Sequence, residues 1–211
     1  LPSEFVPAAE RTNMLKNIDR WMLTAAIDFC KNGEADRVFV RLSRQSITDG
    51  TTASWMEQKL DRDDFDCSRL VVQIPERDAA KHIKQTKSLV KQLRRLGIGF
   101  ALEHYGIDTD RFQILDLLKP DYIKIDGELM HTLTTDNAMQ SAVRKIVEAA
   151  GQRQIKTIAE RVENANAMAV LFQLGLDFMQ GHYVHEPEVV LQDRDSGVTR
   201  TLDDLTAAQA P

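Results

Sequence analysis

A carboxylate and an imidazole, Glu103 and His104, stand side by side in the stretch GFALEHYG, directly after a short apolar run. Apolar runs of this length next to glycine are typical of buried strands. Two titratable groups at a strand end could serve as general acid and base or ligate a metal ion. They could also be the remains of such a site after its chemistry was lost. These residues alone leave both readings open.

Polar side chains also follow the other apolar runs of the chain. The carboxyl ends of parallel strands meet at one edge of a sheet, where ligands bind. Each residue alone has a structural reading, such as a Lys124–Asp126 ion pair or a helix-flanking Glu76 or Glu163. Unpaired charge at buried strand ends is costly, so the series together indicates one ligand site. The residues are Arg41, Ser43, Gln73, Glu76, Glu103, His104, Lys124, Asp126, Glu160, Glu163 and Gln180.

The elements that would position these side chains alternate along the chain. Helical patterns separate the apolar runs, and this alternation predicts a parallel sheet with helices outside. The first helix has a stripe formed by Ile18, Trp21, Met22, Ala25 and Phe29, and further helices are predicted near 83–96 and 139–150. The six predicted strands are 37–42, 70–74, 98–103, 122–125, 155–159 and 177–179.

The strand count favours an α/β fold of the TIM-like (β/α)8 class. Such barrels have eight strands and typically about 250 residues, so we expect one or two N-terminal strands to be absent from this chain. We assign residues 1–193 to the domain and 194–211 to a polar, peripheral tail. An open barrel exposes sheet edges, so full stability should need an N-terminal segment or a partner element. A doubly wound sheet is the alternative, but no glycine-rich phosphate loop follows any strand.

Composition narrows the partners. The net charge of −5 disfavours broad binding to a nucleic-acid backbone. Neither a signal peptide nor an apolar run near the roughly 20 residues of a membrane span is visible, so no membrane insertion is expected. Cys30 and Cys67 lack metal-ligand spacing, which predicts buried thiols in a reducing, cytoplasmic setting.

Three segments carry a family resemblance. The runs EFVPAAERTN, KPDYIKIDGELM and TIAERVENANAMAVLFQLGLDFMQGHYVHEP, between about Glu4 and Pro187, resemble EAL domains, the bacterial cyclic-di-GMP phosphodiesterases. The resemblance implies a modified (β/α)8 barrel whose active members hydrolyse cyclic-di-GMP with two divalent cations and a lysine. The Glu-Ala-Leu signature of the family lies on a strand that would precede residue 1.

The first three predicted strand ends depart from the family pattern. Arg41 stands where the family usually has a metal-ligating asparagine, within Arg-Leu-Ser instead of Asn-Leu-Ser. Gln73 stands in place of a ligating glutamate, and Glu103-His104 in place of Asp-Asp. These changes imply the loss of metal ligands.

The later strand ends keep more of the pattern. Lys124, Glu160 and Gln180 match family positions, whereas Arg161 stands where the family has glycine. The resemblance therefore implies that these residues are the remains of a catalytic site and that the domain is not an active phosphodiesterase. The members of this vestigial site are Gln73, Glu76, Glu103, His104, Lys124, Asp126, Glu160 and Gln180.

Arg41 decides the expected chemistry. Two-metal hydrolysis needs cations about 3.5–4 Å apart between carboxylates. A guanidinium about 4 Å from a cation would repel it by roughly 4 kcal/mol at an effective dielectric near 20. Its forked donors suit a phosphodiester instead. We expect a metal-free receptor pocket with no required cofactor, whose cyclic-di-GMP-binding residues are Arg41, Ser43, Glu160, Glu163, Gln180, Gly181 and Pro187.

The runs VRLSRQS and MQGHYVHEPEVVLQ most resemble FimX-type receptors of type IV pilus systems. That resemblance implies binding without turnover, a PilZ-domain protein partner, and a role in pilus biogenesis and twitching motility. Outer helices such as Ala79–Leu96 are candidates for the partner surface. Two alternatives remain: a weak phosphodiesterase that uses Mn²⁺ with His104, and a protein-binding module in which Arg41 merely pairs with Glu103 or Glu76.

Overall fold

The computed structural model describes residues 2–31, 35–60, 65–107, 112–186, 190–192 and 199–201. Six parallel strands follow one another in chain order across a single sheet, which confirms the predicted α/β class. The strands are β1 (Val38–Arg41), β2 (Leu70–Pro75), β3 (Gly99–Tyr105), β4 (Tyr122–Ile125), β5 (Lys156–Ala159) and β6 (Phe178–Met179).

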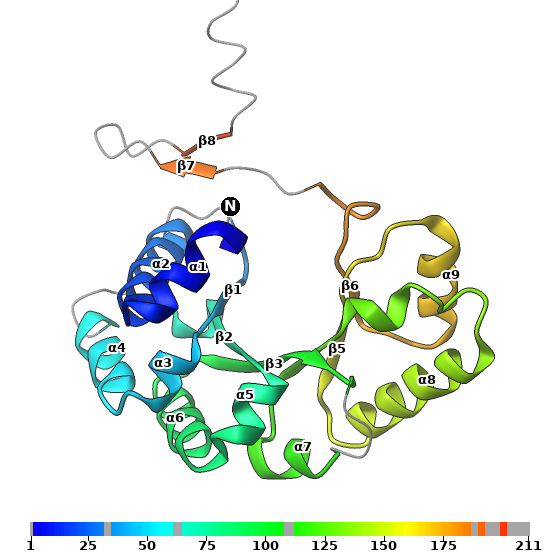
Figure 1. Cartoon of the computed structure of the whole chain (residues 1–211), viewed down its shortest axis with the longest axis horizontal. Coiled ribbons are helices and arrows are strands. Elements are labelled where there is room, and N and C mark those ends of the chain that lie inside the picture. Colours follow the sequence, from blue (N-terminus) through cyan, green and yellow to red (C-terminus); the bar gives the residue numbers. More distant parts are fainter. Residues whose placement is uncertain are drawn as a thin grey trace, which may run out of the picture.

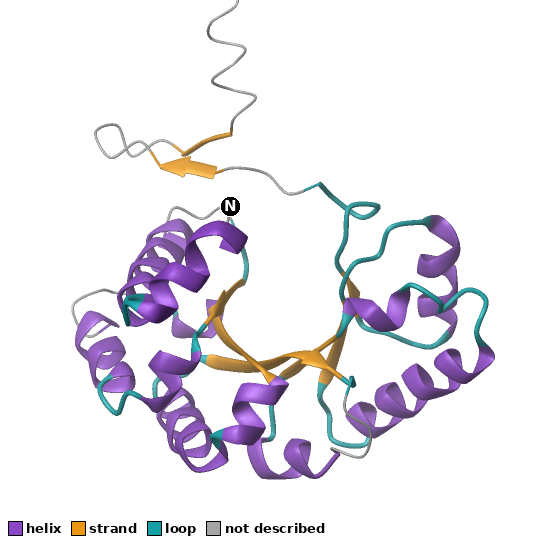
Figure 2. Ribbon diagram, in the orientation of Figure 1, coloured by secondary structure: helices purple, strands orange, loops and turns teal. Residues whose placement is uncertain are grey.

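The sheet curls into a half-barrel with helices on its convex side (Figure 1; Figure 2). Within the described residues, β1 and β6 are the two edges of this sheet. The helices are α1 (Pro2–Arg11), α2 (Leu15–Lys31), α3 (Arg44–Thr48), α4 (Thr52–Leu60), α5 (Glu76–Lys81), α6 (Ile83–Arg95), α7 (Phe112–Leu118), α8 (Asn137–Gly151) and α9 (Ala165–Gln173). Short 3-10 turns cover Cys67–Arg69 and Gly127–Met130.

The core lies between the sheet and these helices. Val72, Phe100, Leu102 and Ile123 are completely buried, and Val40 nearly so. Each such side chain contributes about 1.5–3 kcal/mol by leaving water. Because strand side chains alternate between faces, the residues between them point into the concave side of the half-barrel. Because of this alternation, the concave side of the sheet is more polar than the convex side that the helices cover.

The stripe predicted for α2 is not the buried one. The helix buries Leu23, Ala26 and Ile27 instead, whereas Trp21 remains 60% exposed and Met22 45% exposed. The helix is apolar on two sides, so spacing alone could not say which side meets β1. Packing against β1 selects the side with aliphatic residues.

The helix predicted near 83–96 is confirmed as α6, whereas the wider outer helix 79–96 is divided between α5 and α6. His82 separates α5 from α6, with backbone angles φ −116° and ψ 41° that leave the helical region. On α6, Thr86, Leu89, Val90 and Leu93 are buried, which fixes the opposite face toward solvent.

Outside the curved sheet, β7 (Val190–Gln192) and β8 (Thr199–Thr201) form an antiparallel pair. The boundary predicted at residue 193 lies outside the described residues, so the domain division stays a prediction. Cys30 is buried, but Cys67 is only half-buried, which corrects the expectation of two buried thiols. Within the part of the chain that the structure describes, no helix has the length and apolar content to cross a membrane.

Candidate functional site

Strand alternation gathers the predicted side chains at one rim. Parallel register places Arg41 of β1 level with Gln73 of β2, and Pro75 of β2 level with Glu103 of β3. Lys124 lies two residues after Tyr122 on β4 and so shares the concave face with it. The carboxyl ends of β1 to β5 therefore bring Arg41, Glu103, His104, Lys124 and Glu160 together, as ion pairs between them confirm.

An ion pair closes the β1–β3 side of the rim. Arg41 Nε lies 2.7 Å from Glu103 Oε1, and the arginine side chain is 56% exposed while the glutamate side chain is 4% exposed. Burial raises the pKa of the Glu103 carboxyl, and the Arg41 and His104 charges act in the opposite direction. The guanidinium has no other bond within the described residues, so its two terminal nitrogens remain available.

A second set of contacts closes the β4–β5 side. Lys124 Nζ lies 3.0 Å from Glu160 Oε1, with both side chains largely buried. His104 Nδ1 lies 2.8 Å from Asp126 Oδ2 and 3.6 Å from Glu160 Oε2. Asp126 also accepts the backbone N–H of Glu128 at 2.7 Å, as the N-cap of the turn that follows β4. The Lys124–Asp126 pair considered as a structural alternative does not form, and Lys124 pairs with Glu160 instead.

His104 occupies an unusual backbone conformation, with φ 53°. The register between β3 and β4 shifts between Leu102 and Tyr105, at this same place. A left-handed non-glycine residue is strained, and such strain gathers at functional sites. The irregularity turns the imidazole toward Asp126.

Two further predicted residues, Glu76 and Ser43, make structural contacts, and a third, Gln73, has an oxygen without a partner in the described part of the chain. Glu76 is buried, and its Oε2 accepts the backbone N–H of Gly106 at 3.1 Å. Ser43 donates its hydroxyl to Asp19 at 2.5 Å and caps α3. The buried Gln73 Oε1 has no hydrogen-bond partner among the described atoms. A ligand donor at Gln73 would satisfy that oxygen.

The β6 end is more open. Gln180 and Glu163 are exposed, and Gln180 is held through its backbone to Ala159 and Val162. Gly181 lies so close to the next segment that an added Cβ would be 2.3 Å from the backbone nitrogen of Val162. Pro187 lies outside the described residues, so its predicted contact stays a prediction.

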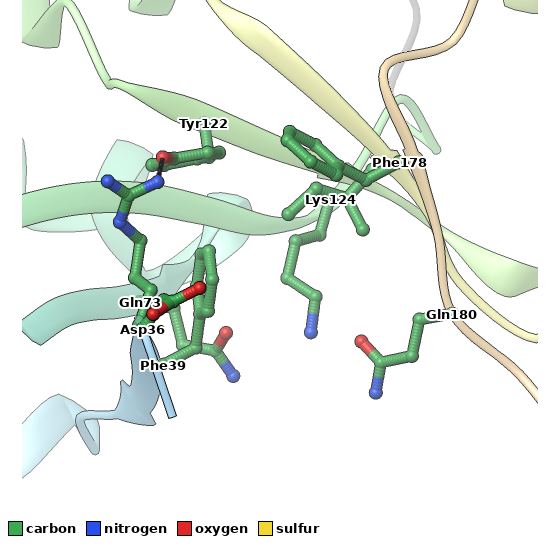
Figure 3. A pocket seen from close by; sticks show the side chains of 9 residues that line it. Asp36, Phe39, Gln73, Tyr122, Lys124, Phe178 and Gln180 are labelled. Carbon is green, nitrogen blue, oxygen red and sulfur yellow. Dashed lines mark hydrogen bonds between the residues drawn. The ribbon is translucent and has the colours of Figure 1, made fainter. Parts of the chain in front are cut away.

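Two cavities adjoin the rim. The larger one, about 710 Å³, fills the concave side, where Lys124, Gln73 and Gln180 lie around one open space (Figure 3). Its floor is aromatic, formed by Phe39, Tyr122 and Phe178 near the amino ends of the strands. A second cavity of about 350 Å³ at the strand ends is lined by Arg41, Pro75, Glu76, Arg77, Asp78, His104, Ile107 and Asp126.

Sequence reasoning missed the aromatic floor and Arg77. Phe39, Tyr122 and Phe178 each precede a predicted polar residue by two positions, so strand alternation was a signal for them. No comparable signal pointed to Arg77, because its position depends on how α5 leaves β2. The site is therefore wider than the strand ends alone.

The rim fits a single metal ion better than a pair. Ligand atoms of His104, Asp126 and Glu160 all lie within 4.8 Å of one another. Glu160 and Glu103 are already bonded to the Lys124 and Arg41 cations, respectively. Two-metal hydrolysis needs several free carboxylates between ions about 3.5–4 Å apart. These residues do not provide the further free carboxylates that a second metal ion would need.

A model of the EAL domain family matches residues 1–187. This match spans most of the chain, so the chain belongs to the EAL domain family. The resemblance inferred from the three segments is thereby confirmed, as is the half-barrel fold.

Solved structures extend this finding. The FimX EAL domain from Pseudomonas aeruginosa bound to c-di-GMP is 30% identical, with a TM-score of 0.84, over 88% of this chain and 76% of that chain. The Xanthomonas citri FimX EAL domain in complex with c-di-GMP is 26% identical, with a TM-score of 0.82, over 88% of this chain and 75% of that chain.

Among curated proteins, the cyclic di-GMP phosphodiesterase PdeF of Escherichia coli is 24% identical over 194 residues, which is 90% of this chain. The chain spans about a quarter of the length of the curated relatives it matches, 26% of PdeF and 22% of the Shewanella oneidensis phosphodiesterase PdeB. The similarity thus concerns one domain of these longer proteins.

Proposed function

We propose that this EAL domain is a receptor that binds cyclic di-GMP at the strand-end rim and does not hydrolyse it. Similarity to FimX EAL domains crystallised with this nucleotide supports the ligand. The pair between Arg41 and Glu103 is also what the protein-binding alternative expects, so the pair alone does not separate the two. The observation that carries the proposal is that Arg41 is 56% exposed at the position where the resemblance expects a metal ligand.

Arg41 supplies the main phosphodiester contact in this proposal. Its Nε lies 2.7 Å from Glu103 Oε1 as an ion pair, although that buried oxygen has no hydrogen-bond partner among the described atoms, and the terminal nitrogens of the guanidinium stay open. A fork of N–H donors binds two phosphate oxygens at once, and such charge-assisted bonds are the stronger kind. No metal cofactor is required, since the arginine supplies the positive charge.

The other predicted binding residues surround this contact. Gln180, Glu163 and Gly181 line the open β6 side, and Glu160 lies between it and His104. Exposed amides and carboxylates there suit the donors and acceptors of a guanine base. Ser43 and Pro187 complete the proposed set, although the Ser43 hydroxyl is donated to Asp19 in this structure and would have to leave it to contact the ligand.

Occupancy must then be transmitted by contact, because a receptor without turnover releases no product. A ligand biases an interface through its different affinity for two states. We place this domain in the cytoplasm, with a PilZ-domain type protein as partner and regulation of type IV pilus biogenesis and twitching motility as the outcome. FimX similarity supports this assignment.

A turnover assay tests the absence of hydrolysis. The full EAL domain incubated with cyclic di-GMP and either Mg²⁺ or Mn²⁺ should leave the nucleotide intact, as followed by chromatography. Parallel calorimetry confirms that the same sample binds the nucleotide. Steady release of linear pGpG at catalytic turnover would overturn the proposal.

The His104–Asp126–Glu160 cluster favours one second candidate, a weak phosphodiesterase using Mn²⁺. Imidazole and carboxylate together suit transition metals better than Mg²⁺. In that case turnover would appear with Mn²⁺ and disappear in His104→Ala. The two candidates therefore differ in one measurable product.

A further inference from the structure

Helices α5 and α6 present a row of exposed cations on a chain whose net charge is −5. Most of the row lies on α6, whose sequence contains no acidic residue. This outer face therefore carries a local excess of positive charge on a chain that is acidic as a whole. The exposed members of this basic row are Arg77, Lys81, Lys84, Lys87, Lys91 and Arg95.

The geometry of α6 aligns the row. At 3.6 residues per turn, Lys84, Lys91 and Arg95 fall within roughly 40° of one another, with Lys87 beside them. A rise of about 1.5 Å per residue makes the stretch from Lys84 to Arg95 roughly 16 Å long. The burial of Leu89 and Leu93 on the opposite side locks this face outward.

The row is poorly neutralised by the chain itself. Arg95 is bound by Glu57, with both carboxylate oxygens at 3.0 Å. For Lys84, Lys87 and Lys91 no ion pair exists within the described residues. Like charges at spacings of three and four residues destabilise a helix. An external partner would offset a repulsion that nothing inside the described chain relieves.

We infer that the basic row is a docking surface for an acidic helix or strip on a partner protein. Polar Gln85 and Ser88 flank the lysines, so the row offers no aromatic side chain for stacking bases and no apolar wedge for a bilayer. An extended polyanion would also meet the acidic remainder of the surface. A short acidic segment is long enough to cover the row of roughly 16 Å and avoids repulsion from the acidic surface beyond it.

The row also begins at the strand-end rim. Arg77 lines the same cavity as Arg41 and His104, and the remaining cations follow along α5 and α6. A partner on this surface would therefore sit beside the rim. The partner in the proposed function would then carry an acidic contact surface. The inference itself rests on the charges of α5 and α6, and it stands whether or not nucleotide binds.

Two charge-matched variants test the docking surface. Lys84→Glu/Lys91→Glu reverses two cations of the row, and Arg144→Glu/Lys145→Glu reverses two exposed cations on α8. Both variants have the same net charge, so general repulsion is equal. The probe is a fluorescent helical peptide with glutamates along one face, compared with its glutamine counterpart, phosphatidylserine vesicles and duplex DNA.

At 50 mM salt the acidic peptide should bind wild type, and the α6 variant should bind it roughly tenfold or more weakly because exposed charge pairs are lost. The α8 variant should stay within about twofold, and amide shifts on binding should map to 77–95. Equal losses in both variants, no peptide binding, or tighter binding to vesicles or DNA would overturn the inference. Nucleotide titration in the same samples reports the receptor proposal separately.

Discussion

The two halves of the rim use ion pairs in different ways. On the β4–β5 half, Lys124 is 8% exposed and Glu160 15% exposed, so both partners are largely withdrawn from water. On the β1–β3 half, Glu103 is just as buried, but Arg41 is 56% exposed. The first pair is enclosed, and the second is anchored at one end and open at the other.

That difference separates a structural role from a binding role. The enclosed pair matches the family pattern, while the open pair is where the sequence departs from it. A buried carboxylate that holds an exposed guanidinium orients a donor toward solvent without satisfying it. The β1–β3 half of the rim, where the sequence departs from the family pattern, is therefore the half that can bind an anionic ligand.

Lys124→Met should produce the largest effect, on stability. The variant leaves Glu160 charged and buried without its partner, and breaking such a pair costs about 3–5 kcal/mol. Lys156→Met is the matched control, since Lys156 pairs with Asp177 at 2.6 Å but is 58% exposed. Its cost should be much smaller, because a solvent-exposed ion pair contributes little to stability. Urea unfolding measures both, and equal losses would contradict the distinction between the two kinds of pair.

Arg41→Ala should weaken cyclic di-GMP binding by roughly 1.5–3 kcal/mol, the range for a hydrogen bond to a charged group. Arg95→Ala removes a similarly exposed arginine of α6 from its partner Glu57 on α4 and should leave the affinity unchanged. Calorimetry reports both values. An unchanged affinity in the Arg41 variant would show that the open pair is structural.

Glu103→Gln should change the pH dependence of stability. Burial raises the pKa of Glu103, so the native state holds its proton more tightly than the unfolded chain does. This contribution to stability is complete below the unfolded pKa and is lost as pH rises through the folded pKa. The glutamine variant should therefore gain stability relative to wild type as pH rises.

Thermal unfolding between pH 4 and pH 8 measures that difference. Glu57→Gln, at an exposed pair, should follow wild type over the same range. A constant difference between Glu103→Gln and wild type would mean that the buried carboxyl does not titrate differently on folding.

Arg161→Gly should have the smallest effect. Arg161 adopts φ 55°, where glycine is unstrained, and its side chain lies across Gly127. Relief of a left-handed conformation is worth about 1–2 kcal/mol per residue, less the entropy of a new glycine. A net gain below roughly 1 kcal/mol is expected, as for the control Gln154→Gly at φ 59°. A loss in Arg161→Gly alone would mean that its packing matters more than its strain.

The sequence predicted the strands well because parallel strands buried between helices read as continuous apolar runs. It failed on α2, where two apolar sides compete and only the position of β1 decides. It also joined α5 to α6, because nothing in the residues around His82 breaks the helical pattern. Long elements with a strong hydrophobic pattern could be predicted from the sequence. The buried face of α2 and the break at His82 depend on tertiary packing and could not be predicted.

The sequence predicted which residues lie at the rim, but not which of them form ion pairs with one another. Strand-end position brought Arg41, Glu103, Lys124 and Glu160 together correctly. Which charges pair depends on side-chain length and on the bulge at His104, and neither follows from strand order. The structural reading of the individual residues paired Lys124 with Asp126, whereas in the structure Asp126 contacts His104 and Lys124 contacts Glu160.

The most direct test of the central claim is calorimetric titration of the full EAL domain with cyclic di-GMP, in EDTA and again in Mg²⁺ or Mn²⁺. If Arg41 supplies the charge that a metal would otherwise bring, affinity should be the same within about twofold in all three conditions. The nucleotide recovered afterwards should be intact. Binding that vanishes in EDTA and returns with metal would contradict the account.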